Sequence, residues 1–141
     1  MFFKNKELIA ENQRLEKELA AYQTVKEELR EEMLYIELNA DGRIRAINDL
    51  CTQATGFKIS ELEGKSLESL MDPKSLKKSD VQDMLGAVKN HRHWHGAVSF
   101  NNAQGREIWV RGIIQPIDDA YGNVKCISFY MAEQTRNISY S

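Results

Sequence analysis

Apolar positions in the first third of the chain recur at alternating steps of four and three residues, which is the spacing of a coiled-coil seam. Residues 4–34 contain no Gly and no Pro and are rich in Glu, Lys, Leu, Ala and Gln, which favour a helix. The seam positions are Leu8, Asn12, Leu15, Leu19, Tyr22, Lys26, Leu29, Met33 and Ile36. The pattern predicts a helix over residues 1–33 that pairs with another helix along this seam.

Two of the seam positions, Asn12 and Lys26, are polar. A polar residue at a core position weakens a coiled coil but favours a parallel, in-register dimer, in which two Asn side chains can pair across the axis. We therefore expect a homodimer, with this set of contact residues: Leu8, Asn12, Leu15, Leu19, Tyr22 and Leu29. A helix folded onto its own chain and a frayed arm are the alternatives that the spacing leaves open.

From residue 34 the apolar period changes from helical to the alternation of a strand. The segment "LYIELNADGRIRAIND" predicts strand, turn and strand, with "NADG" as the turn and Gly42 free to take a positive φ. Asn48 or Asp49 can then cap a short helix, and Gly56 can end it. These signals place a hairpin and a short helix directly after the long N-terminal helix.

Further helix starts are predicted at Ser60, which forms a capping-box pattern with Glu63, and at Ser79 or Asp80. The last third of the chain predicts three strands, separated by the turns "NNAQG" and "DDAYGN". This order of elements predicts an α+β fold, in which one five-stranded antiparallel sheet carries short helices on one face.

Composition narrows the class of protein. The 141 residues are 42% hydrophobic with a net charge of -2, which allows a core and argues against a surface for nucleic acid. Two cysteines cannot build a disulfide framework, so a reducing, cytoplasmic setting is expected. No apolar run approaches the roughly 20 residues of a membrane span. No phosphate loop, nucleophile elbow or HExxH motif is present, so we expect that the protein is not an enzyme.

Three segments of the chain together resemble a PAS domain over about residues 34–135. They are "ADGRIRAIN", "TGFKISELEGKSLESLMDP", which is similar to the family pattern T-G-[YF]-x-x-x-E-L-x-G-K, and "GNVKCISFYMAEQT". The resemblance implies a PAS fold over residues 34–136, with residues 137–141 starting a linker. Glu133 and Thr135 stand where many PAS domains carry a D-x-T motif at the exit toward their output segment.

The segment "DMLGAVKNHRHWHGAVSFNNAQGREIWVRGIIQPI" is similar to PAS domains of bacterial methyl-accepting chemotaxis proteins, including the flavin-binding aerotaxis receptor. This resemblance implies a cytoplasmic sensory and dimerisation module that acts by a conformational change. Its partners would be chemotaxis signalling proteins, reached through a C-terminal region outside these residues. The alternatives are a ligand-free PAS scaffold for protein–protein interaction and a haem-binding gas or redox sensor.

The flavin-binding group departs from this chain at two places. Where that group has two basic residues followed by Pro and an acidic residue, this chain has Met71, Asp72, Pro73 and Lys74. Where that group has an aromatic residue after "DM", this chain has Leu85. The resemblance therefore disfavours flavin and leaves the cofactor unknown. Haem would need an axial histidine, and the candidates are His93 and His95.

All three histidines lie in "NHRHWHGAVSF". On one strand they would share a face, as in a three-histidine metal site, but the PAS pattern starts the strand near Trp94 and no acid or cysteine completes the set. We expect no metal site, and instead a polar loop with Trp94 against the sheet edge.

Alternation in "REIWVRG" places Trp109 and Arg111 on one face of a strand. Either they contact a ligand or partner, or Trp109 is a half-buried residue of the outer sheet face. Cys51 and Cys126 are expected to fill the core. The candidate pocket or surface residues are therefore Trp94, Trp109 and Arg111.

Overall fold

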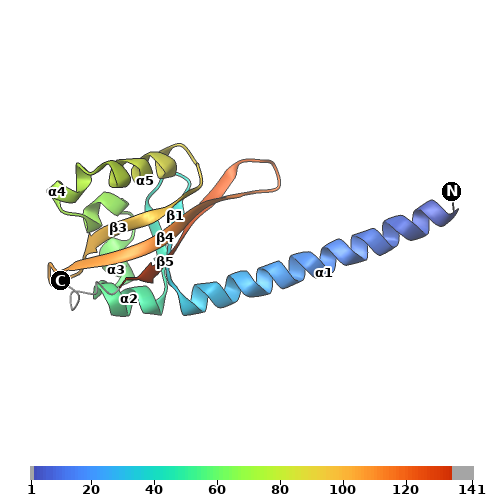
Figure 1. Ribbon diagram of the computed structural model, residues 1–141, viewed down its shortest axis with the longest axis horizontal. Helices are drawn as coiled ribbons and strands as arrows, with labels where there is room; N and C mark the ends of the chain where they lie inside the picture. The colour runs from blue at the N-terminus through green and yellow to red at the C-terminus, as the bar shows by residue number, and fades with distance from the viewer. Residues whose placement is uncertain (1, 135–141) are drawn as a thin grey trace, which may run out of the picture. The chain divides into compact units, whose positions relative to one another are not determined.

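The computed structural model describes residues 2–134, with side chains from residue 5 onward, and the chain divides into two compact units after Glu32. The first unit is helix α1 (Phe2–Glu32), and the second contains every other element (Figure 1). The predicted long N-terminal helix is confirmed. Its predicted seam is too long, because Met33 lies beyond the helix and Ile36 lies in the first strand.

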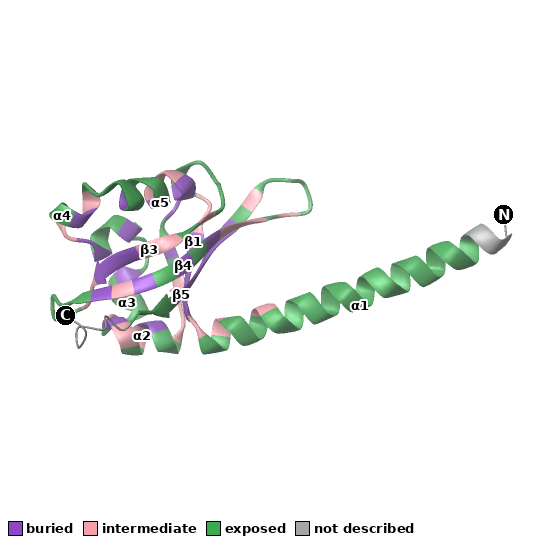
Figure 2. Ribbon diagram, in the orientation of Figure 1, coloured by how far each residue is buried: buried purple, intermediate pink, exposed green. Residues whose placement is uncertain are grey.

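Helix α1 exposes its apolar side chains in the single chain, as the green colouring in Figure 2 shows. Along the helix, Leu8 is 57% exposed, Leu15 49% and Leu29 38%. Arg14 forms ion pairs with glutamates one turn away on either side, which support the helix itself. The helix therefore has local stabilisation along its length, and its seam side chains are exposed on the helix itself.

The second unit is built on a five-stranded antiparallel sheet, as predicted. Its strands are β1 (Leu34–Asn39), β2 (Ile44–Ile47), β3 (Trp94–Asn101), β4 (Glu107–Asp118) and β5 (Val124–Glu133). Their order across the sheet is β2-β1-β5-β4-β3, so that the last strand of the chain lies in the centre. The α+β fold class is confirmed.

Short helices connect β2 to β3 and pack on one face of the sheet (Figure 1). They are α2 (Asp49–Thr55), α3 (Ile59–Leu62), the 3₁₀ helix η1 (Leu67–Leu70), α4 (Pro73–Leu76) and α5 (Ser79–Lys89). The core lies between these helices and the sheet, and its largest fully buried side chains include Phe129, Leu38, Ile44, Leu67, Met84 and Ile114. None of the described helices is long and apolar enough to cross a membrane.

Helix α2 begins and ends as the sequence predicts. The side chain of Asn48 accepts a hydrogen bond from the Cys51 N–H at 2.9 Å and a second one from the Tyr35 N–H at 3.2 Å. Gly56 ends the helix in the left-handed region at φ 75°, which a glycine adopts without strain. Asn48 thus joins the helix start to the first strand.

The predicted caps of α3 and α5 are wrong. In α3 the Glu61 carboxylate accepts from the Lys58 N–H at 3.0 Å, so Ser60 and Glu63 form no capping box. In α5, Ser79 is already the first helical residue and no side chain caps the helix. The cap that the sequence analysis missed is Asp72, whose carboxylate accepts from the Ser75 N–H at 2.8 Å and whose pKa is lowered by that hydrogen bond.

The hairpin of β4 and β5 extends beyond the rest of the sheet as an arm (Figure 1). The last partner of β3 on β4 is Ile114, and the last partner of β1 on β5 is Cys126. Pro116 follows in β4, and a proline has no N–H with which to continue a ladder. At the tip, the Asp119 carboxylate accepts from two backbone N–H groups, while Tyr121 is 89% exposed.

Candidate functional site

The outer face of the sheet carries the polar chemistry of the second unit. We define it by the side chains that point away from the helices: Tyr35, Glu37, Cys126, Ser128, Tyr130, Trp109, Arg111 and Ile113. These alternate with the core residues along the same strands. Two features lie on this face, a hydrogen-bonded network on β1, β2 and β5 and a groove over β3, the middle of β4 and the end of β5.

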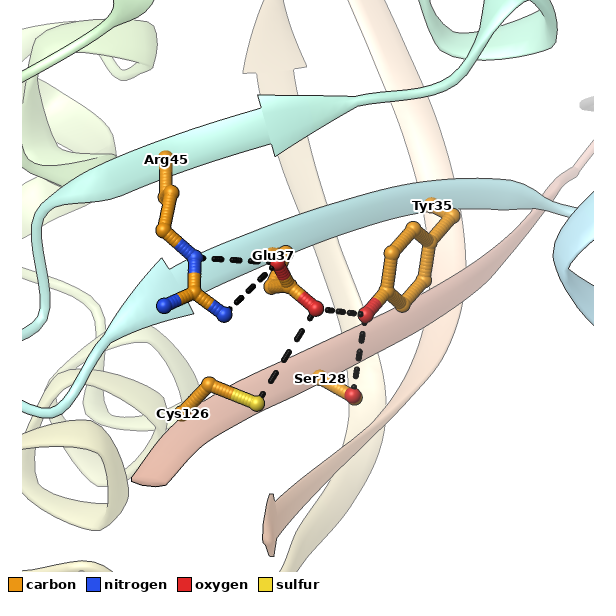
Figure 3. A network of polar contacts seen from close by, with 5 residues as sticks. All are labelled: Tyr35, Glu37, Arg45, Cys126 and Ser128. Carbon is orange, nitrogen blue, oxygen red and sulfur yellow. Dashed lines mark hydrogen bonds and ion pairs between the residues drawn. The ribbon is translucent and has the colours of Figure 1, made fainter. Parts of the chain in front are cut away.

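The network is centred on the carboxylate of Glu37 (Figure 3). Its Oε2 accepts from Arg45 Nε at 3.0 Å and Nη2 at 2.9 Å, and its Oε1 lies 3.0 Å from the Tyr35 hydroxyl. That hydroxyl is also 3.0 Å from Ser128 Oγ. The Glu37 side chain is 18% exposed, so this charge is largely removed from water and held by its partners.

The charge pair in this network is mutually stabilising. The hydrogen bond to Glu37 raises the pKa of Arg45, more than burial lowers it. Cys126 Sγ lies 3.9 Å from Glu37 Oε1, as a weak donor to the same carboxylate. Cys126 and Cys51 are both buried, as expected, but Cys126 faces this outer network, whereas Cys51 lies in the core cluster between the helices and the sheet.

Two neighbouring tyrosines on this face differ in the hydrogen-bond partners of their hydroxyl groups. Tyr35 and Tyr130 are both 6% exposed, with ring centres 5.1 Å apart. The Tyr35 hydroxyl has Glu37 and Ser128 as partners. The Tyr130 hydroxyl is buried and has no hydrogen-bond partner within the described part of the chain. The same chemical change at the two positions therefore gives a controlled comparison.

We expect Tyr35→Phe to lower the free energy of unfolding by about 1–2 kcal/mol, because the Glu37 carboxylate and Ser128 lose a partner in a buried place. Tyr130→Phe is expected to leave stability unchanged or to raise it, because it removes only an unpaired buried hydroxyl. Urea unfolding of both variants measures the difference. Equal losses at the two positions would contradict the assignment of partners.

The core thiol of Cys51 is protected by its burial, which raises its pKa to about 11. Near pH 8 about one such thiol in a thousand is a thiolate, so we expect labelling by a thiol reagent to be slow until the chain unfolds. Above pH 9.0, the ordinary pKa of a thiol, Cys51 ionises in the unfolded chain but stays protonated in the folded chain. The free energy of unfolding therefore falls as pH rises from 9 toward 11. A Cys51→Ala variant should lack this part of the slope in a pH series of unfolding measurements. Rapid labelling of the folded chain at Cys51 would contradict the prediction.

The interior between helices and sheet is almost filled. The core void has a volume of about 10 Å³ and is lined by apolar side chains, among them Leu70, Phe100 and Met131. A space of that size holds about one water molecule, whereas small-molecule pockets measure about 300–1,000 Å³. This void is therefore far smaller than a small-molecule pocket.

The groove on the outer face brings together three residues that the sequence analysis singled out, His95, Arg111 and Glu133. Its volume is about 520 Å³. It is lined by Met33, His95, Gly96, Arg111, Gly112, Ile113, Tyr130, Ala132, Glu133 and Gln134. The other predicted exit residue, Thr135, lies outside the described residues. Ile113, which the sequence analysis did not select, is 53% exposed in this groove.

Neither tryptophan lines the groove. Trp94 is half-buried and meets Phe129 edge-on at 6.3 Å between ring centres, so it packs against the core. Trp109 lies on the outer face, where its Nε1 donates to Glu107 at 2.5 Å and the Lys78 ammonium lies 5.3 Å from the ring centre. Trp109 is thus held by contacts within the chain.

The histidines are dispersed. His91 and His93 precede β3, and the strand begins at Trp94 as expected. His91 takes a positive φ of 53° and its Nε2 lies 2.7 Å from the Ala40 carbonyl oxygen, which ties the loop to the β1–β2 turn. Among the described residues, no three side chains of metal-binding type gather at one point.

A second, larger cleft lies beside the helices, between the β1–β2 turn, η1 and α5. Its volume is about 740 Å³, and its lining mixes apolar residues with the charged side chains of Asp41, Glu68 and Lys89. None of the predicted pocket residues Trp94, Trp109 and Arg111 lies in this cleft. The outer face therefore remains the place where predicted residues converge.

Comparison with known proteins decides the family. A family model described as "PAS domain" matches residues 31–136, which is most of the chain. The chain belongs to the PAS domain family. This PAS domain is also similar to the biofilm dispersion protein BdlA of Pseudomonas aeruginosa, with 22% identity over 101 residues. The match covers 72% of this chain and 24% of BdlA, so the chain spans about a quarter of the length of that relative.

Proposed function

We propose that this PAS domain is the cytoplasmic sensory and dimerisation module of a methyl-accepting chemotaxis receptor. The observation that carries the proposal is the uncovered heptad seam of α1 directly before a PAS domain. A helix of this kind needs a partner to bury its leucines, and Asn12 favours a parallel arrangement of two copies. The similarity of "DMLGAVKNHRHWHGAVSFNNAQGREIWVRGIIQPI" to chemoreceptor PAS domains supports the receptor assignment.

Signal output would pass through β5. This strand lies in the centre of the sheet, pairs with both β1 and β4, and ends at Glu133. A change in how the outer face packs would shift the end of β5 and the chain that follows it. Such a switch between two packings needs no chemical step.

The mass of the particle in solution tests the dimer. Light scattering of the purified chain should give twice 16.2 kDa. A mass of 16.2 kDa over the whole accessible concentration range would reject dimerisation. The receptor assignment needs a separate test in the full-length protein, where substitution of Glu133 should alter signalling while the PAS domain remains folded.

A ligand-free scaffold is the second candidate function, and the core void of about 10 Å³ favours it. Native mass spectrometry of the chain purified from its own cells separates the two candidates. A mass equal to the polypeptide, with no visible absorption band, supports the scaffold. Extra mass that is released on unfolding supports a bound ligand.

A further inference from the structure

The cleft between the β1–β2 turn, η1 and α5 is separate from the interior of the fold. Its volume of about 740 Å³ lies in the range of small-molecule pockets. It shares no lining residue with the core void, and none of its lining residues belongs to β3, β4 or β5. The part of the lining that α5 supplies recurs at steps of three and four residues, which is one face of a helix: Gln82, Leu85, Gly86 and Lys89.

Apolar side chains form part of the wall of this cleft. Leu76 and Leu85 are partly buried and pack against the core, and Leu67 is 2% exposed. Three small residues of the lining occupy little of the space: Ala40, Gly42 and Gly86. An apolar group that covers Leu76 and Leu85 gains free energy, because it removes their remaining surface from water.

Two charged residues of the lining, one acidic and one basic, are exposed on different elements. The ion pairs within the described part of the chain include neither Glu68 of η1 nor Lys89 of α5. The carboxylate of Asp41, which also lines the cleft, lies 3.8 Å from Arg43 Nε within its own turn. A ligand that carries one cationic and one anionic group is complementary to Glu68 and Lys89.

His91 joins two walls of the cleft. It follows α5, and its Nε2 lies 2.7 Å from the carbonyl oxygen of Ala40 in the β1–β2 turn. Among the described residues it is the one non-glycine residue with a positive φ, at 53°, and strain of this kind gathers at ligand-binding sites. Asn39, which precedes Ala40, pairs with Cys126 of β5. A ligand between these walls would therefore contact a turn that continues directly into the strand paired with β5.

We propose that this cleft binds a small zwitterionic ligand with an apolar body, either an apolar amino acid or a dipeptide with free ends. The apolar body lies on Leu76 and Leu85, the ammonium group faces Glu68, and the carboxylate faces Lys89. The inference deepens the proposed sensory function, on which it rests for the role of the site in the cell, by naming a class of ligand. It does not depend on the dimer.

Isothermal titration calorimetry of the full chain with leucine and with leucyl-leucine tests the site. We expect saturable binding of at least one probe, and the tighter probe decides between an amino acid and a dipeptide. Gly86→Phe, which places a ring in the cleft, should abolish binding, whereas Gly86→Ala should bind like the wild type. Binding of neither probe at millimolar concentration, or binding that survives Gly86→Phe, would overturn the proposal.

Both substitutions at Gly86 should leave the domain folded. The atom nearest to an added Cβ is Nη2 of Arg92, the flexible end of an exposed side chain, at 3.4 Å. Alanine and phenylalanine also have higher helix propensity than glycine. Circular dichroism of the two variants should therefore match the wild type, which makes a difference between them in binding a property of the cleft.

Charge neutralisation gives an independent measurement. Glu68→Gln and Lys89→Gln should each raise the dissociation constant of the tighter probe about two- to fivefold, as expected for exposed ion pairs. Asp83→Asn and Lys77→Gln change exposed residues outside the lining and should have no effect. Variants at Glu68 and Lys89 that bind as tightly as the wild type would overturn the assignment of charges.

Modified probes identify which residue faces which group. N-acetylation removes the positive charge of the probe, so Glu68→Gln should cause no further loss of affinity for the acetylated probe. Amidation of the carboxylate should remove the effect of Lys89→Gln in the same way. If Glu68→Gln weakens the acetylated and the free probe equally, the proposed pairing is wrong.

The outcomes separate this inference from the proposed function. A dimer that binds neither probe overturns the cleft site alone. A monomer that binds a probe in the cleft overturns dimerisation and leaves the site in place. Binding that Gly86→Phe abolishes would also count against the ligand-free scaffold.

Discussion

Gly112→Ala is expected to destabilise the second unit by about 3 kcal/mol, which is the upper range for overpacking a core. Gly112 lies on the inner face of β4, and a Cβ atom added there would lie 2.4 Å from Phe129 Cε1 and 2.8 Å from the Tyr130 carbonyl oxygen. The second neighbour is backbone in the middle of the sheet, so it cannot move aside cheaply. For a domain of this size, the loss corresponds to a melting temperature lower by roughly 10–20 °C.

Two other glycines serve as controls for Gly112. At Gly96, the cross-strand partner, an added Cβ would lie 2.7 Å from Trp94 Cζ2, and the half-buried indole can shift. We therefore expect Gly96→Ala to lower the free energy of unfolding by less than Gly112→Ala does. At Gly105 no atom would lie within 4 Å of an added Cβ, and φ is +79°. Alanine there should therefore lower the free energy of unfolding only by the backbone strain, about 1–2 kcal/mol. If thermal unfolding shows the same loss at all three positions, the steric explanation is wrong.

Replacing Leu15 and Leu19 together by Glu is expected to convert the proposed dimer to a monomer. The two residues occupy adjacent core positions of the seam, and in a parallel coil the change places four carboxylates in the interface. Both side chains belong to α1, outside the compact unit that forms the PAS domain, so the PAS domain should keep its fold. Light scattering should fall from twice 16.2 kDa to 16.2 kDa, while circular dichroism retains the strand signal.

The control for the coil adds the same charges elsewhere on the helix. Ala10→Glu with Ala20→Glu changes positions outside the seam and should leave a dimer. Dissociation by the control as strongly as by the seam variant would show that total charge, and not the seam, decides association. A dimer that survives the seam variant would assign the association to another surface.

The order of elements could be predicted because several boundaries, those of α2 among them, have a local cause. Asn48 and Gly56 act through hydrogen bonds and backbone angles within their own helix. The end of α1 was less predictable, because the heptad spacing continues to Ile36 in the sequence. Pairing of Ile36 with Phe129 of β5 and Ile47 of β2 draws this residue into the sheet, and no local pattern contains that information.

The candidate site was predictable only in part. Alternation placed Arg111 on the same face as Trp109, but β5 is buried on both faces, so the contact of Cys126 with Glu37 could not be derived from its pattern. Glu37 itself has a weak signal, as the one charged residue in the strand "LYIELN" with a basic residue across the turn. The short distance between Gly112 and the ring of Phe129 depends on how that ring packs in the core. No local sequence pattern determines this packing.

The hairpin arm offers a place to attach a reporter. Its tip is tied by Asp119 to the backbone of Tyr121 and Asn123, and the strands on either side of it have already ended. Exposed tips of this kind tolerate inserted residues, so an epitope or a fluorophore-binding peptide between Ala120 and Gly122 should leave the fold intact. Such a label would follow the arm in living cells without touching the seam, the network or the groove.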